Sequence, residues 1–440
     1  MNNATETLEK RVIRKTMRRI LPFALLLYII AYLDRVNLGY AALQMNADLA
    51  LTAEVFGLLS GIFFIGYFLF EVPSNMIMHK VGAKIWIARI MVTWGIISSL
   101  TAWAQTPMHL YILRFLLGVA EAGFFPGIIL YLTYWFRVQE RGRAAAFIII
   151  AMPIGGMIGG PLSTWIMTNV EWLGWTGWRW MFVLEGLPAV LLGIVTLFYL
   201  TDRPSKAKWL TDEEKNWLET ELTKEQQQKK QTTKTSKKEM FKDSNIWKLS
   251  FIYFLNFGAV YGLAFWLPSI IKSVSETLSL TSIGWLSTIP SIIAIPSMIL
   301  WAWHSDKTNE RRGHLMISFV IAAIGFIGCG FTSSAYMTIA CIAFAAIGLY
   351  SFSGVFMSYV TTFFTDSTAP VGIATVNSLA SLGGFFGPMV FGYFTFSTGM
   401  FFVGALLFTA FLVLLTMKNR EPEQSAVEAS QQQTVSAFKK

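Results

Sequence analysis

Two residues of opposite charge, Asp34 and Arg35, stand side by side inside a long apolar segment, LPFALLLYIIAYLDRVNLGY, at positions 21–40. A charged side chain at the centre of a membrane helix costs about 2.5–3.5 kcal/mol on insertion scales, so an ionisable pair there indicates a functional site. Arginine stays protonated and presents a planar fork that matches a carboxylate. A buried carboxyl group can load and release a proton. The pair therefore indicates anion binding combined with proton exchange.

A second pair of charges, Arg114 and Glu121, lies in the apolar segment YILRFLLGVAEAGFFPGIILYL. Their spacing places both side chains on one face of a helix, about 10 Å apart along its axis. We expect them to share one cavity with Asp34 and Arg35, in which Asp34 and Glu121 exchange protons. The alternative is a pair of structural ion bridges, Asp34–Arg114 or Glu121–Arg35. The two interpretations overlap, because gates often work by making and breaking such bridges.

The composition of the chain is that of a membrane protein. Of its 440 residues, 54% are hydrophobic and only 14% are charged, whereas soluble domains carry about 25% charged residues. The hydrophobic residues form runs of about 20, the length that crosses a hydrocarbon core of about 30 Å. The net charge of +9 does not indicate a nucleic acid partner, because the basic residues flank the apolar runs as membrane topology requires. The sequence predicts an all-α polytopic membrane protein.

Hydropathy divides the chain into twelve predicted spans. They cover about 20–42, 54–78, 84–104, 108–136, 143–168, 179–200, 247–271, 282–303, 314–333, 336–364, 370–395 and 399–417. Lysine and arginine are concentrated in the loops on one side, which places both termini in the cytoplasm. The expected divisions are a basic tail, a first six-helix bundle, a linker with a surface helix from about Thr211, a second bundle and a tail: 1–19, 20–200, 201–246, 247–417 and 418–440.

The two halves of the chain share short motifs at equivalent places. Gly160-Pro161 recurs as Gly387-Pro388, and Lys80 recurs as Lys307. These matches predict two pseudo-symmetric bundles of six helices. That arrangement resembles the major facilitator fold, in which the substrate site lies between the halves near the membrane midplane.

The second half offers hydrogen-bonding groups but no charge in its predicted spans. Between positions 251 and 415 these span interiors contain no Asp, Glu or Arg; their polar residues include Tyr253, Asn256, Tyr261, Ser353, Tyr359, Asn377, Ser381 and Tyr393. Asn377 is the preferred binding candidate, because a buried amide needs partners. Two further carboxyls, Glu71 and Glu185, precede prolines, so we expect them to serve backbone groups that the prolines free.

Several motifs resemble those of the major facilitator superfamily and, more specifically, its anion:cation symporter family. The loop HKVGAK at 79–84 and the segment from His304 to Arg312 resemble the two copies of the superfamily's signature loop. Four further segments, spread over both the early and middle spans, resemble the symporter family: LDRVN at 33–37, EVPSN at 71–75, RFLLGVAEAGFFPG at 114–127 and WRWMFVLEGLP at 178–188.

This resemblance implies proton-coupled uptake of a small organic anion, such as an aromatic acid, tartrate or a sugar acid, across the bacterial cytoplasmic (inner) membrane. It implies proton-coupling roles for Asp34 and Glu121, with Arg114 as their partner. Substrate contacts are expected from Arg35, Tyr32, Tyr67, Asn377, Ser353 and Met152. A gating role is expected for Lys80, Gly82, Lys84, Asp306, Arg311 and Arg312.

Two positions depart from the family pattern. His79 stands where many facilitators have aspartate, so we expect a weakened gating ion pair. Met152 stands where sugar-acid carriers place a glutamine, which favours an aromatic or less hydroxylated acid.

Two other classes of function compete with proton symport. An anion exchanger or uniporter of the same fold would keep Arg35 but would not require protonation of Asp34 and Glu121. An enzyme is not expected, because the sequence contains no nucleotide loop, metal cluster or catalytic constellation. We expect a monomer surrounded by membrane lipid, without cofactor or metal; the sequence leaves open whether protons or sodium ions drive transport.

Overall fold

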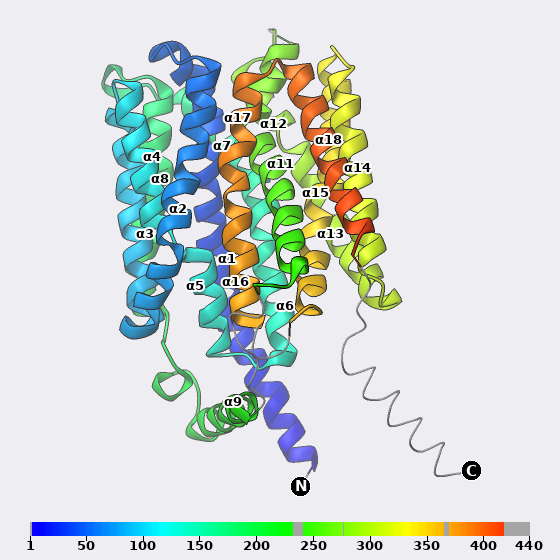
Figure 1. Ribbon diagram of the computed structural model, residues 1–440. Coiled ribbons are helices and arrows are strands. Elements are labelled where there is room, and N and C mark those ends of the chain that lie inside the picture. Colours follow the sequence, from blue (N-terminus) through cyan, green and yellow to red (C-terminus); the bar gives the residue numbers. More distant parts are fainter. Residues whose placement is uncertain (1, 232–240, 276, 365–368, 418–440) are drawn as a thin grey trace, which may run out of the picture.

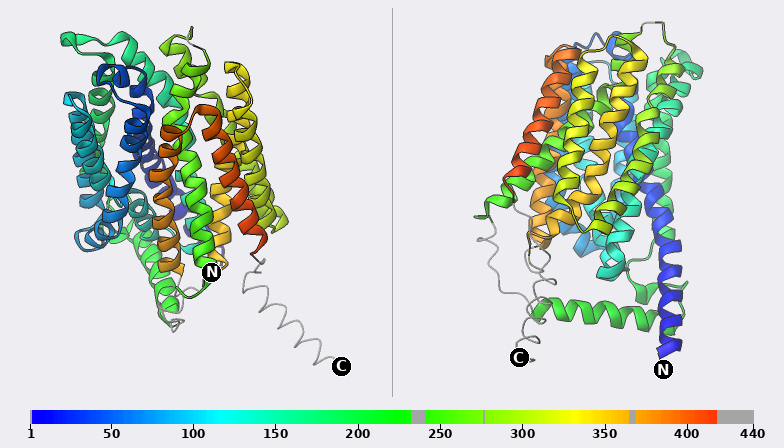
Figure 2. Two further views of the ribbon diagram at one scale, coloured as in Figure 1. Left: turned by 45° about the horizontal axis from the view of Figure 1, so that its top comes forward. Right: turned by 90° about the vertical axis from the view of Figure 1, so that its right-hand side faces the viewer.

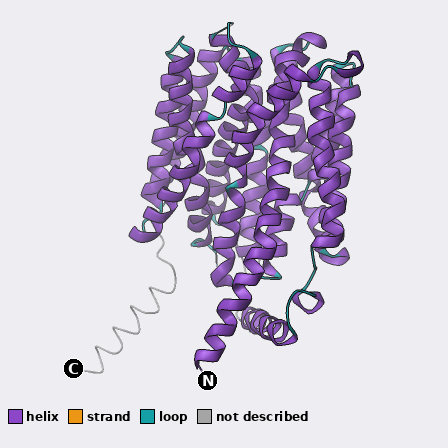
Figure 3. Ribbon diagram, turned by 180° about the vertical axis from the view of Figure 1, so that it is seen from behind, coloured by secondary structure: helices purple, strands orange, loops and turns teal. Residues whose placement is uncertain are grey.

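The computed structural model describes residues 2–231, 241–275, 277–364 and 369–417. All regular secondary structure in these residues is helical (Figure 3). They contain twelve helical segments that are long and apolar enough to cross a membrane, which confirms the predicted all-α membrane fold. The predicted linker stretch 232–240 and the tail 418–440 lie outside the described residues.

The first six spans run from the N-terminus to Tyr199. They comprise α1 (Asn2–Asp48), α2 (Ala53–Val81), α3 (Ala83–Leu100), α4 (Pro107–Glu121), α5 (Phe124–Thr133), α6 (Val138–Ile149), α7 (Ala151–Asn169) and α8 (Gly177–Tyr199). Three short 3₁₀ helices lie in this part of the chain and after it: η1 (Thr101–Trp103), η2 (Trp172–Gly174) and η3 (Pro204–Lys206).

Helix α9 (Asp212–Gln231) connects the two groups of spans. The last six spans comprise α11 (Ser244–Val274), α12 (Leu280–Leu286), α13 (Ile289–Thr308), α14 (Arg312–Gly330), α15 (Ala335–Thr361), α16 (Ala369–Ser381), α17 (Gly383–Tyr393) and α18 (Phe396–Leu415). The two groups stand side by side, and α9 lies at the same end as the N-terminus (Figure 1).

Four spans that the sequence predicts as continuous are each divided into two helices: α4/α5, α6/α7, α12/α13 and α16/α17. The break between α4 and α5 has a clear backbone cause, since Gly123 has a φ of 82°, a conformation that glycine adopts without steric cost. Pro153 and Pro290 follow two of the other breaks. Proline lacks the amide hydrogen that would donate the next helical hydrogen bond, so a break in the helix near it costs little additional free energy.

The two groups of spans pack tightly at the end away from the N-terminus, where α2 meets α17, α7 meets α12 and α1 meets α11 (Figure 1). Glycines make this contact close. A Cβ atom on Gly160 would collide with the carbonyl oxygen of Gly284, and one on Gly61 would lie 2.5 Å from the carbonyl oxygen of Phe385. Small residues at helix crossings allow backbones to approach in this way.

Helix α1 begins well before the predicted span, and its basic N-terminal part contacts α9, which lies across the end of the bundle (Figure 2). Glu214 of α9 accepts a hydrogen bond from Lys15 Nζ at 2.7 Å and lies 3.1 Å from Arg11 Nε. Glu214 also bonds the backbone amide of Thr211, whose hydroxyl accepts from the amide of Glu214. This reciprocal pair is a capping box, so the predicted surface helix is fixed both internally and to α1.

The Glu214 contacts predict that docking of α9 depends on pH. Burial by itself would raise the pKa of Glu214, but the hydrogen bonds from Lys15 and Thr211 and the charge of Arg11 hold that pKa below its ordinary value. Stabilisation is therefore present above the unfolded-state pKa of about 4.3 and is lost as the pH falls through the lower folded-state pKa. Hydrogen-exchange protection of α9 should disappear only in that acidic range.

At neutral pH we expect Glu214→Gln to speed amide exchange in α9 about fivefold, corresponding to about 1 kcal/mol for ion pairs with partly exposed cations. Asp212→Asn is the matched control, because the Asp212 side chain is 92% exposed and forms an ion pair with Lys215 of the same helix. Equal exchange rates in the two variants would contradict the docking role of Glu214.

Candidate functional site

Arg35 of α1 and Glu121 of α4 form a buried ion pair through Arg35 Nη2 and Glu121 Oε1. Glu121 is the last residue of α4, immediately before the break at Gly123. The break thus ends the helix where its acidic side chain meets the arginine. Of the two ion bridges expected from the sequence, this one is present.

Arg35 also joins the two groups of spans. Its Nη1 donates a hydrogen bond of 2.8 Å to the hydroxyl of Tyr261 on α11. Its guanidinium carbon lies 5.2 Å from the ring centre of Phe63, 5.5 Å from that of Tyr67 and 5.8 Å from that of Tyr261. A cation surrounded by aromatic rings at these distances is stabilised by their π-electrons.

A small cavity lies beside Arg35, between the two groups of spans. Its volume is about 30 Å³, and it is lined by Arg35, Phe64, Tyr67, Glu71, Phe257, Asn377 and Ser381. This volume accommodates a water molecule but no organic acid, so the halves are closed around Arg35. The structure brings together three of the predicted binding residues, Arg35, Tyr67 and Asn377.

Glu71 is a cavity residue that the sequence interpretation missed. Its Oε2 accepts a hydrogen bond of 3.0 Å from Ser378 of α16, so it bonds a side chain across the interface. We expected the Glu71 carboxylate to bond a backbone group that Pro73 leaves free, and no such bond is found among the described residues. Its position one helical turn after Tyr67 was the signal that could have placed it in the cavity.

Asp34 faces away from this cavity, into the first group of spans. Trp94 Nε1 donates to Asp34 Oδ2 at 2.6 Å, and Ser98 Oγ donates to Oδ1 at 2.8 Å. Arg114 is buried and interacts electrostatically with Asp34, yet the expected Asp34–Arg114 ion pair is absent from the described structure. Among the described residues, two guanidinium nitrogens of Arg114, Nε and Nη2, have no hydrogen-bond partner.

Three predicted substrate contacts do not line the cavity. Tyr32 is buried, with its hydroxyl 3.4 Å from that of Tyr350 on α15, so it too connects the two groups of spans. Met152 on α7 and Ser353 on α15 are half-buried in their helices. These two remain candidates only for a more open form of the protein.

The first signature loop contains a tight turn fixed by an aspartate. Gly82 has a φ of 100°, and Asp202 Oδ1 accepts a hydrogen bond of 2.8 Å from the backbone amide of Lys84. Asp202 follows α8, so this bond joins the end of the sixth span to the start of the third. Lys80 and His79 are exposed. Neither of them forms an ion pair in the part of the chain that the structure describes.

The second signature loop is held by different contacts. Arg311 lies 4.0 Å from Asp306, whereas Arg312 donates to the carbonyl oxygens of Leu414 and Leu415 at the end of α18. Cations at a helix C-terminus stabilise its free carbonyl groups.

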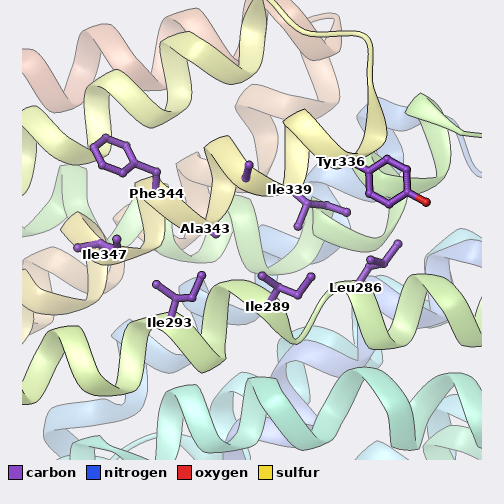
Figure 4. Close-up of a pocket in the computed structure, with 9 residues that line it drawn as sticks. Leu286, Ile289, Ile293, Tyr336, Ile339, Ala343, Phe344 and Ile347 are labelled. Atoms are coloured by element: carbon purple, nitrogen blue, oxygen red, sulfur yellow. The ribbon is translucent and has the colours of Figure 1, made fainter.

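An apolar groove of about 430 Å³ lies between α12, α13 and α15 (Figure 4). Its lining is Leu286, Ile289, Ile293, Tyr336, Ile339, Ala340, Ala343, Phe344 and Ile347. Its lining contains no cation that could pair with a carboxylate. The polar cavity at Arg35 is the candidate site.

The break beside Glu121 predicts a specific cost for Gly123→Ala. A non-glycine residue at this left-handed position costs about 1–2 kcal/mol, and its Cβ would lie 2.7 Å from Ser74 Oγ. We expect a lower melting temperature in detergent. Gly142→Ala is the control, because nothing lies within 4 Å of its Cβ and alanine favours a helix. If the Gly123→Ala protein were as stable as this control, the predicted backbone strain at position 123 would be contradicted.

The sequence of this chain is similar to known proteins over nearly its whole length. The model of the Major Facilitator Superfamily matches residues 24–277 and 270–440. A protein of Agrobacterium vitis named "Putative tartrate transporter" is 45% identical over 421 residues, covering 94% of this chain and 96% of the relative. The "Quinolone resistance transporter" of Acinetobacter baumannii is 38% identical over 98% of this chain and 99% of its own.

The fold is also similar to that of solved transporters. The xylose transporter XylE from E. coli, in a partially occluded inward open conformation, superimposes with a TM-score of 0.76 at 15% identity, covering 92% of this chain and 98% of XylE.

Proposed function

Because the chain belongs to the Major Facilitator Superfamily, we propose that it is a proton-coupled symporter for uptake of a small organic carboxylate, such as tartrate, an aromatic acid or a sugar acid. Members of this family are multi-pass membrane transporters and not enzymes. The proposal concerns the coupling ion, the substrate and the roles of individual residues.

The observation that carries the proposal is the buried Arg35–Glu121 ion pair beside the interface cavity. Removing one partner from a buried ion pair costs about 3–5 kcal/mol, because the other charge is left without compensation. A substrate carboxylate can replace Glu121 at the Arg35 fork only if Glu121 loses its charge. Protonation of Glu121 achieves this, so anion binding and proton binding occur together.

The remaining cavity groups suit a hydroxylated or aromatic acid. Tyr67, Asn377 and Ser381 offer neutral hydrogen bonds, and Phe64 and Phe257 offer ring faces. The name of the Agrobacterium vitis relative supports tartrate as the first substrate to test. A melting-temperature screen of purified protein against tartrate, sugar acids and aromatic acids would identify the acid that binds, since ligands stabilise the folded state.

The proposed transport direction follows from the loop charges. Basic residues flank the spans at the end that carries the N-terminus and α9, which favours a cytoplasmic location for that end. The tightly packed opposite end then faces outward, and the cavity would open toward the cytoplasm to release substrate and proton.

Uptake into proteoliposomes under an imposed pH gradient tests the proposal. We expect wild-type protein to accumulate tartrate above equilibrium, and we expect Asp34→Asn and Glu121→Gln only to equilibrate it. Arg35→Ala should weaken binding about ten- to a hundredfold, because hydrogen bonds to a charged group contribute about 1.5–3 kcal/mol. Glu213→Gln, on the exposed face of α9, is the control for an acid-to-amide change.

Two results would contradict the proposal. Full gradient-driven accumulation by both carboxyl variants would point to an exchanger or uniporter that does not use these protons. Normal affinity in Arg35→Ala would place the carboxylate elsewhere.

A further inference from the structure

Arg114 on α4 is a buried cation whose hydrogen-bond donors are not fully used. It is 1% exposed, and neither Nε nor Nη2 has a hydrogen-bond partner among the described residues. These two nitrogens lie on one edge of the planar guanidinium group, where two parallel N–H bonds match the two oxygens of a carboxylate. The unused edge therefore has the form of a carboxylate-binding group.

The neighbouring Asp34 does not occupy this edge. Asp34 attracts Arg114 electrostatically, but the part of the chain that the structure describes contains no ion pair between them. Both oxygens of Asp34 accept hydrogen bonds from other side chains, from Trp94 at 2.6 Å and from Ser98 at 2.8 Å. The charge of Asp34 thus lowers the cost of burying Arg114, while the two N–H groups still lack an acceptor.

Arg114 and Arg35 face the same helix of the second half. The guanidinium carbon of Arg35 lies 5.8 Å from the ring centre of Tyr261, and that of Arg114 lies 6.0 Å from the ring centre of Phe265. These two rings are on successive turns of α11, with their centres 6.2 Å apart. The two cations therefore contact α11 at neighbouring turns, at the interface between the halves.

The cavity at Arg35 lies beside the same two rings. Phe64 lines the cavity, and its ring centre lies 4.7 Å from that of Tyr261 and 6.4 Å from that of Phe265. Phe265 thus separates Arg114 from the second half in this closed form. Because both arginines belong to the first half and both face α11, movement of α11 away from the first half would uncover them together.

The arrangement suits an acid with two carboxylates on a short carbon chain. A four-carbon diacid holds its carboxyl carbons about 4 Å apart, since three C–C bonds of about 1.5 Å join them. Each N–H···O hydrogen bond adds about 3 Å, so such an acid can join guanidinium nitrogens up to about 10 Å apart. The rings that the two cations face are 6.2 Å apart, which is within this reach.

We infer that the Nε–Nη2 edge of Arg114 binds a second carboxylate of the substrate, while the first carboxylate is bound by Arg35. The transported acid is then a short dicarboxylate, because a monocarboxylate would leave the edge of Arg114 empty. This inference rests on the proposed binding of a carboxylate at Arg35, and it narrows the substrate class from organic acids in general to diacids.

Ligand pairs that differ in one carboxylate test the inference in wild-type protein. Calorimetry in detergent compares tartrate and succinate each with its monoamide, in which a neutral amide replaces one carboxylate. We expect a diacid to bind about ten- to a hundredfold more tightly than its monoamide, because a hydrogen-bonded charge is lost. Equal affinities within each pair that binds would overturn the inference. Binding of a monocarboxylate without binding of either diacid would overturn it as well.

The role of Arg114 is tested by the same ligands on variants. In Arg114→Gln we expect tartrate to bind no more tightly than its monoamide, and we expect the affinity for the monoamide to stay at the wild-type value. Arg89→Gln is the control, because the Arg89 guanidinium stacks on Trp86 of its own helix, 3.8 Å from the ring centre. Equal weakening of both ligands by Arg114→Gln would show a purely structural role for Arg114 and would overturn the inference.

A second variant covers the case in which Arg114→Gln does not fold. Arg114→Lys keeps a positive charge near Asp34 but lacks the planar edge with two parallel donors. We expect it to fold and to prefer tartrate over the monoamide less strongly than wild-type protein does. A preference as large as that of wild-type protein would contradict bidentate binding at Arg114.

These binding experiments need no pH gradient, so they separate the inference from proton symport. If Arg114 gives tartrate its advantage over the monoamide while a gradient drives no uptake, proton coupling fails and the second carboxylate site stands. If a gradient drives accumulation of tartrate and of its monoamide equally well, and the two bind with equal affinity, symport stands and the site at Arg114 fails.

Discussion

The structure depends on one constraint: the guanidinium of Arg35 is buried and needs an anionic partner. In this conformation the partner is Glu121, and Tyr261 supplies a further hydrogen bond from the other half. Leaving the buried charge of Arg35 without a partner would cost about 3–5 kcal/mol. That cost is a large fraction of the free energy of unfolding of a typical protein. Exchange of one anion for another at Arg35 is therefore the event to which proton binding and movement of the halves can be coupled.

The surrounding helices confine the exchange of anionic partners to the neighbourhood of Arg35. The break at Gly123 ends α4 beside Glu121, and the glycine contacts between α7 and α12 close one end of the bundle. The first half holds the buried charges, whereas the second half meets them with neutral groups such as Tyr261 and Ser378. Neutral partners can be broken and reformed at lower cost than ion pairs, so the second half can move relative to the first.

Hydropathy predicted the twelve spans closely, because bilayer thickness fixes the length of each apolar run. The same signal could not show that α1 starts at Asn2, since that part is held by ion pairs with Glu214 on α9. The break after Glu121 was also missed, because the apolar pattern continues through Gly123. Charge type predicted Arg35 and Glu121 as candidates, but the choice between alternative ion pairs, and the cavity position of Glu71, depend on packing between helices.

Calorimetric titration in buffers of different ionisation enthalpy tests the central claim most directly, because it counts the protons that accompany substrate binding. At a pH where Glu121 is ionised, the exchange at Arg35 predicts uptake of about one proton per bound tartrate or other identified acid in wild-type protein. In Glu121→Gln, the same exchange predicts no proton uptake that can be attributed to this site. Binding of the acid to wild-type protein without proton uptake would contradict the account.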